Sequence, residues 1–166
     1  MEPLIVPILM VALVMTPYVL VRTYAAIKSR EVDSRAAAAV GLALLFILTG
    51  IGHFAKAEPM SQMLPGWVPM RVPIIYLTGV MEFALALGFI IPRTRRWAGW
   101  AAAALLVLFF PANIYAAVHR LPFGGEWGPA YLLIRTPLQA FLLFWAYWFC
   151  VRAPARAPIE ESPHGN

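Results

Sequence analysis

The stretch IIYLTGVMEFALALGFII, residues 74–91, is an apolar run with a single carboxylate, Glu82, near its centre. Its length of 18 residues is close to the ~20 that an α-helix needs to cross the hydrocarbon core of a bilayer. A charged side chain at the centre of such a helix costs about 3 kcal/mol, so it normally pairs with another polar group or serves a function. Glu82 is therefore the first candidate for a functional residue.

Four further apolar stretches occur in the chain, at residues 4–26, 36–55, 97–119 and 131–151. Hydrophobic residues make up 61% of the 166 residues and charged residues only 13%. A soluble domain carries about 25% charged residues. We therefore predict an all-α integral membrane helical bundle with five transmembrane helices. Residues 152–166 are rich in proline and polar residues and are predicted to form a disordered cytoplasmic tail.

The basic residues predict how the chain is oriented in the membrane. With five spans, the connections after the first and third spans share one side with the C-terminal tail. That side carries nine basic residues and the other side three, and Lys and Arg are enriched on the cytoplasmic side of membrane proteins. We expect a bacterial inner-membrane protein with its N-terminus outside and its C-terminus in the cytoplasm. Because these charges cluster beside the apolar spans, they indicate topology and not a nucleic-acid partner.

Glycines and prolines mark places where helices meet or end. Gly50 and Gly52 in the second span and Gly79 in the third would allow a neighbouring helix to approach closely. The connection at residues 58–73, EPMSQMLPGWVPMRVP, contains four prolines and a glycine, which excludes a long helix there. We expect this connection to lie in the interface or against the bundle, with Trp67 at the level of the lipid headgroups.

The strongly polar residues within the spans all fall in the outer half of the predicted bundle. At about 1.5 Å rise per residue, Glu82 lies roughly 12 Å from the outer end of its span. The other polar residues lie at a similar or shallower depth and are Arg135, Gln139, Asn113 and His53. These five residues predict a ligand-binding pocket beneath the 58–73 connection, with Glu82 and Arg135 as an ion pair that anchors the ligand.

A purely structural role for the same residues stays open. Glu82 and Arg135 could form an interhelical clamp that sets helix register and binds no ligand, since buried ion pairs are costly to break singly. Asn113 and Gln139 could hydrogen-bond across helices, which is the commoner role of such residues in membranes.

Other kinds of chemistry have less support in the sequence. His53 and His119 lie on separate spans and could ligate a haem, but no further ligand accompanies them, and we predict no metal site. The single cysteine, Cys150, excludes an internal disulfide and a Cys-x-x-Cys redox pair. We find no self-contained catalytic motif and none for flavin, haem or an iron–sulfur cluster. Whether the chain is an enzyme therefore stays open, and at most it is a subunit of a membrane oxidoreductase.

The chain contains, in this order, GIGHF (50–54), LPGWVP (64–69), TGVMEFALALGFIIP (78–92), FFPANIY (109–115) and RTPLQAFLLFWAY (135–147). Together these segments resemble the DoxX and DoxX-like family of small integral membrane proteins. The resemblance implies a four-helix transmembrane core at residues 30–151, to which residues 1–29 add one N-terminal transmembrane helix. It also implies association with a quinol oxidase or a thiosulfate:quinone oxidoreductase, with oxidative or thiol-stress systems, or, in distant animal relatives, with receptor assembly.

The residues and the resemblance leave three functional hypotheses open. In the first, the outer pocket binds a quinone or another amphipathic small molecule, and a redox partner protein carries out any electron transfer. In the second, the chain is a structural or assembly subunit that docks against another membrane protein and binds no ligand. The third is a proton-coupled transporter, which is weaker because the sequence shows no inverted repeat. Quinone is the one cofactor that these hypotheses include, the lipid bilayer is the expected environment, and a homo-oligomer stays open in each case.

Overall fold

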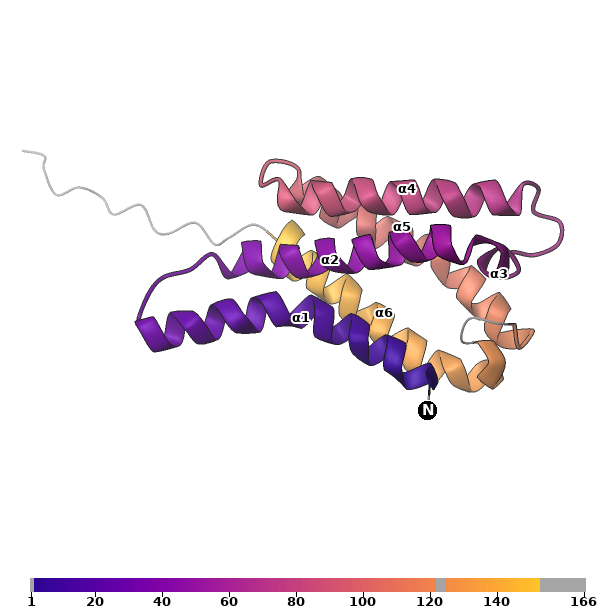
Figure 1. Cartoon of the computed structure of the whole chain (residues 1–166), viewed down its shortest axis with the longest axis horizontal. Helices are drawn as coiled ribbons and strands as arrows, with labels where there is room; N and C mark the ends of the chain where they lie inside the picture. The colour runs from indigo at the N-terminus through magenta and orange to yellow at the C-terminus, as the bar shows by residue number, and fades with distance from the viewer. Residues whose placement is uncertain (1, 122–124, 153–166) are drawn as a thin grey trace, which may run out of the picture.

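The computed structural model describes residues 2–121 and 125–152, which form a bundle of long helices (Figure 1). The elements are α1 (Glu2–Lys28), α2 (Ser34–Ala55), α3 (Ala57–Ser61), α4 (Arg71–Ile90), α5 (Arg95–Val118), η1 (Gly125–Tyr131), α6 (Leu132–Ala146) and η2 (Tyr147–Val151). The described residues contain no strand, and the all-α prediction is confirmed. The tail predicted to be disordered lies outside the described residues, apart from Arg152.

Five helical segments are long and apolar enough to cross a membrane: Leu4–Lys28, Ser34–Ala55, Arg71–Ile90, Arg95–Val118 and Trp127–Val151. They agree within a few residues with the five predicted spans. The chain is therefore a multi-pass membrane protein by helix length and hydropathy. Many large aliphatic side chains on these helices are exposed, including Leu77, Leu108 and Leu133. Lipid is the solvent that suits such a surface, because hydrocarbon side chains cost nothing against hydrocarbon tails.

Figure 1 shows which connections lie at each end of the bundle, and the sequences of these connections differ in their content of basic residues. We call one end the basic end, because the α1–α2 connection, the α4–α5 connection and Arg152 lie there with most of the arginines and lysines. Two arginines there satisfy carbonyl groups at helix ends: Arg35 Nη1 donates to Arg152 O at 2.7 Å, and Arg95 Nε donates to Phe89 O at 3.1 Å. A cation at a helix C-terminus is also favoured by the helix dipole. The opposite end, which we call the α3 end, holds the start of α1, α3 and η1.

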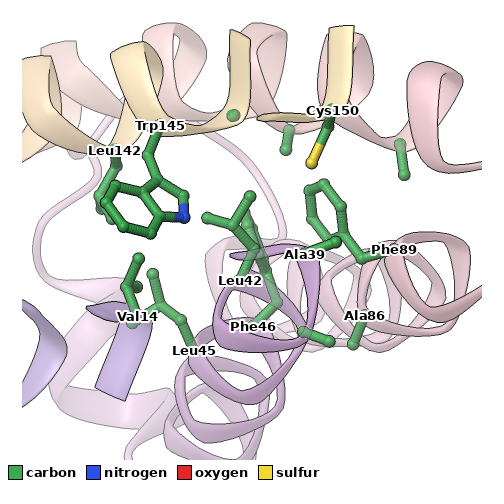
Figure 2. Close-up of a cluster of buried hydrophobic side chains, with 14 of the residues drawn as sticks. Val14, Ala39, Leu42, Leu45, Phe46, Ala86, Phe89, Leu142, Trp145 and Cys150 are labelled. Carbon is green, nitrogen blue, oxygen red and sulfur yellow. The ribbon is translucent and has the colours of Figure 1, made fainter. Parts of the chain in front are cut away.

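Helix α2 lies at the centre of the bundle, with α1 on one side and α4 on the other (Figure 1). Its Leu42 is buried together with Val14 of α1 and Phe89 of α4, and these are the largest fully buried side chains (Figure 2). Trp145 of α6 completes the core, because its Nε1 donates to Ala38 O of α2 at 3.2 Å. This bond satisfies the indole N–H inside an apolar core and joins α6 to α2.

Glycines set the closest approaches between helices. Gly41 of α2 lies directly against the Val14 backbone of α1, and a Cβ atom at this position would overlap the Val14 carbonyl group. Gly79 of α4 lies against His53 and Phe54 of α2, as the sequence predicts. The prediction for Gly52 is wrong, because a Cβ atom there would meet nothing within 4 Å. Helical periodicity places Gly52 and Gly50 on different faces, and only Gly50 faces α4, where it meets the Phe83 ring.

The proline-containing connection between α2 and α4 forms no long helix, as predicted. It contains the five-residue helix α3, followed by turns, and α4 begins only at Arg71. Met70 precedes α4 with a left-handed backbone at φ 52°, which ends the turns and redirects the chain. Trp67 is 83% exposed, which fits an aromatic side chain at the membrane–water interface.

Candidate functional site

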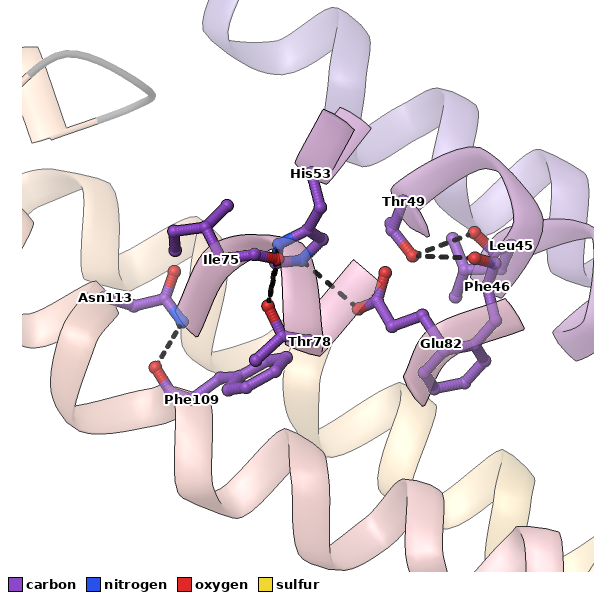
Figure 3. A network of polar contacts seen from close by, with 9 residues as sticks. All are labelled: Leu45, Phe46, Thr49, His53, Ile75, Thr78, Glu82, Phe109 and Asn113. Carbon is purple, nitrogen blue, oxygen red and sulfur yellow. Dashed lines mark hydrogen bonds and ion pairs between the residues drawn. The ribbon is translucent and has the colours of Figure 1, made fainter. Parts of the chain in front are cut away.

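Buried polar side chains lie inside the bundle, and Figure 3 shows three of them, His53, Glu82 and Asn113. His53 comes from α2, Glu82 from α4, Asn113 from α5 and Gln139 from α6, and each is at most 8% exposed. Four of the five predicted site residues are therefore buried. The fifth, Arg135, is half-buried on α6.

The acidic residue Glu82 pairs with His53, since His53 Nε2 lies 3.6 Å from Glu82 Oε1. The expected ion pair between Glu82 and Arg135 is wrong, because no such contact within 4.0 Å occurs among the residues the structure describes. The reason is the direction in which α4 packs. Gly79 allows α4 to lie against α2, and this contact turns the Glu82 side chain toward α2 and not toward α6.

Thr78, which was not among the predicted site residues, completes this pair. Thr78 Oγ1 lies 3.0 Å from His53 Nδ1 and donates to the Ile75 carbonyl oxygen at 2.7 Å. Thr78 and Glu82 are four residues apart on α4 and so share a face of the helix. That spacing is the signal in the sequence that points to Thr78, which lies one helical turn before Glu82.

Asn113 of α5 is a further buried polar side chain inside the bundle. Its Nδ2 donates to Phe109 O at 2.9 Å, one turn earlier in the same helix. The Phe109 ring lies beside the His53 ring, with 6.1 Å between the ring centres. The cross-helix hydrogen bond considered for Asn113 is therefore not the one that the structure describes.

Two buried polar atoms have no hydrogen-bond partner among the described residues: Glu82 Oε2 and Arg135 Nε. Buried polar atoms in folded proteins nearly always have a partner, so each such exception calls for an explanation. A carboxylate oxygen needs a hydrogen-bond donor, whereas a guanidinium nitrogen needs an acceptor. Among the described residues, Glu82 Oε2 therefore lacks a hydrogen-bond donor and Arg135 Nε lacks an acceptor.

The second histidine considered for haem ligation lies in a different environment. His119 is exposed at the end of α5, where its Nδ1 lies 2.9 Å from Tyr115 O and its ring lies against the Tyr115 ring. His53 is buried between α2 and α4. Across residues 2–121 and 125–152, no group of three or more His, Cys, Asp or Glu side chains could hold a metal ion.

Two open apolar grooves lie on the surface of the bundle. One, of about 730 Å³, runs between α1 and α6 and is lined by side chains such as Val11, Met15 and Phe141. The other, of about 490 Å³, is lined by Ile51, Phe54, Ala55 and Phe83. Phe54 and Phe83 directly follow His53 and Glu82 in the sequence, so this second groove flanks the helix segments that carry the buried pair.

Comparison with known proteins identifies the family and leaves the activity open. No curated protein and no solved structure matches the chain. A family described as a domain of unknown function, DUF8561, matches residues 42–150. The matched region runs from α2 to η2 and leaves α1 out, and it contains all five predicted site residues. Because the match covers more than half of the chain, this multi-pass membrane protein belongs to the DUF8561 family.

Proposed function

We propose that the polar cluster forms a pocket for an amphipathic small molecule, such as a quinone, within a membrane redox or stress system. The pocket residues would be Glu82, Arg135, Gln139, Asn113 and His53. The observation that carries the proposal is the pair of buried polar atoms, Glu82 Oε2 and Arg135 Nε, that the described residues do not satisfy. A ligand with both a donor and an acceptor in its head group, such as the reduced quinol form of a quinone, would satisfy both atoms.

The energetic case rests on the cost of leaving such atoms unpaired. An unsatisfied buried polar group costs about 1–3 kcal/mol, and more when it is charged. Water is absent from the hydrocarbon core, so only protein, ligand or a local water-filled cavity can supply the missing partner. Two such groups on separate helices destabilise the folded bundle if they stay unpaired. A bound ligand that pairs with both therefore explains them better than a purely structural role does.

The resemblance to DoxX-like proteins belongs to the same proposal. All five segments that carry the resemblance lie within residues 42–150, the region that matches DUF8561. The DUF8561 match also supports a four-helix core, residues 30–151, with α1 as an added N-terminal helix. A redox role would require a partner protein to supply or accept electrons.

A protein in the proposed membrane orientation has its α3 end outside and its basic end in the cytoplasm. Gly66 and Ser29 are exposed at the α3 end and the basic end, respectively, and suit labelling. In a Cys150→Ala background, Gly66→Cys should react with a membrane-impermeant maleimide added to intact spheroplasts. Ser29→Cys should react only after the membrane is opened. The reverse pattern would overturn the orientation.

Co-purification tests whether the cluster binds a ligand. The full chain would be extracted in a mild detergent, and its bound small molecules identified by mass spectrometry. We expect a stoichiometric amphipathic molecule in the wild type and at least a tenfold lower content in Glu82→Gln. Glu58→Gln is the matched control, because it makes the same chemical change at an exposed position near the α3 end. Bulk membrane lipid alone in all three proteins would contradict the pocket.

A second candidate function is a structural or assembly subunit without a ligand. The observation that favours it is the His53–Glu82 pair, which joins α2 to α4 and could serve only to hold them together. In that case Glu82→Gln would lower stability but leave the small-molecule content of the purified protein unchanged.

A further inference from the structure

The hydrogen bonds of Thr78 determine where the hydrogen atoms of the His53–Glu82 pair lie (Figure 3). Thr78 Oγ1 lies 2.7 Å from the carbonyl oxygen of Ile75, which carries no hydrogen. The single hydroxyl hydrogen of Thr78 must therefore point to Ile75. It follows that Thr78 Oγ1 accepts a hydrogen bond from His53 Nδ1, 3.0 Å away. His53 thus carries a hydrogen on Nδ1.

With Nδ1 protonated, a neutral His53 has a lone pair on Nε2. This atom faces Glu82 Oε1 at 3.6 Å. If Glu82 were ionised and His53 neutral, two lone pairs would face each other inside the bundle, which is unfavourable where the local dielectric is low. An ion pair, with a proton on His53 Nε2 and Glu82 ionised, removes the conflict and fits the 3.6 Å contact.

In this ion pair Glu82 is a carboxylate, so its second oxygen, Oε2, is a hydrogen-bond acceptor. This oxygen is buried and has no partner among the described residues. Thr49 lies beside Glu82 in Figure 3, but its hydroxyl is directed to the carbonyl groups of Leu45 and Phe46 at 3.1 and 3.4 Å. From α5, the Phe109 ring offers no N–H or O–H group to the pair. The missing partner is therefore a donor from outside these side chains.

We infer that the site selects ligands with a hydroxyl group that donates a hydrogen bond to Glu82 Oε2, which makes the ligand an amphipathic alcohol or phenol. The inference rests on the proposed function, because it specifies the ligand of the same pocket. A head group that contains only carbonyl groups, such as that of an oxidised quinone, would leave this oxygen unpaired. Thr78 is a positioning residue, since it acts on the ligand only through the orientation and protonation of His53.

A matched pair of probes tests the inference on the full chain in lipid nanodiscs. para-Nonylphenol carries one hydroxyl donor, and its methyl ether, para-nonylanisole, has the same tail and no donor. Equilibrium dialysis against protein-free nanodiscs corrects for partition into the bilayer. We expect the phenol to bind the wild-type protein about tenfold more tightly than the ether, as is typical when a buried polar group loses its partner.

Variants then connect the preference to the named residues. The phenol-to-ether ratio should fall to about one in Glu82→Leu and in Thr78→Val. It should be retained in Thr78→Ser, which restores the hydroxyl, and in Glu58→Gln, which changes an exposed carboxylate. Thr78→Val provides the test if Glu82→Leu does not fold. An unchanged ratio in folded Thr78→Val would overturn the role of Thr78.

Probe binding to the wild-type protein distinguishes failure of the hydroxyl preference from failure of the proposed pocket. Equal binding of phenol and ether would overturn the inference and leave the pocket itself intact. Binding of neither probe above the empty nanodisc would overturn the inference, and co-purification without any stoichiometric ligand would then also overturn the proposed function.

Discussion

Gly41→Ala is expected to lower the stability of the protein by about 3 kcal/mol, the upper part of the range for overpacking a well-filled contact. A Cβ atom at this position would lie 2.8 Å from the Val14 carbonyl carbon and 3.0 Å from its Cα. Both are backbone atoms of α1, so no flexible side chain can move aside. The substitution would therefore push α1 away from α2. A melting curve of the purified protein in detergent would measure the loss.

Gly52→Ala is the matched control for this prediction. It makes the same change in the same helix at a position where a Cβ atom meets nothing within 4 Å. Alanine is also a better helix former than glycine by about 1 kcal/mol, so this variant should be at least as stable as the wild type. Equal melting temperatures for the two variants would mean that α1 does not pack on α2 through Gly41.

Glu82→Leu should cost about 3 kcal/mol or more, because it leaves the His53 imidazole buried without its partner. His53→Leu should have a similar cost, because it isolates the Glu82 carboxylate. The double variant should recover much of the loss, since an apolar pair of similar volume commonly replaces a buried polar pair at little cost. Denaturant or thermal unfolding of all four proteins in one detergent gives the coupling energy.

A second double-mutant cycle combines Glu82 with Arg135. It distinguishes the His53–Glu82 pair of the structure from the Glu82–Arg135 ion pair expected from the sequence. In ligand-free protein, Glu82→Leu should couple less strongly to Arg135→Leu than to His53→Leu, because Glu82 forms an ion pair within 4.0 Å with His53 and not with Arg135. Strong coupling of Glu82 to Arg135, together with weak coupling to His53, would contradict the described geometry. It would favour the ion pair that the sequence first indicated.

Much of the fold was predictable from the sequence because the bilayer limits the choices. In hydrocarbon each span must satisfy its own backbone hydrogen bonds, so an apolar run of about 20 residues becomes a helix. The five runs therefore marked the five helices to within a few residues. The same reasoning predicted that Glu82 would be buried, because a carboxylate within an apolar span is unfavourable on the lipid side.

The partner of Glu82 was not predictable in this way. His53 and Arg135 both lie at a suitable depth, and depth follows from counting residues along each helix. Which of them meets Glu82 depends on which helix packs against α4 and on the rotation of α4 about its axis. Gly79 permits the close contact with α2, but the sequence alone does not say which helix will use that space.

The sequence by itself thus determined the number of membrane spans, their extent, and which polar residues lie within the bundle. Only the tertiary structure decided that His53 and Thr78 complete the site around Glu82, that Arg135 forms no ion pair with it, and that α1 packs on α2 through Gly41. The physical reason is that hydrophobicity acts on each helix separately and sets its position along the membrane normal. Contacts between side chains depend on the rotation and neighbours of each helix, which the packing of the whole bundle settles.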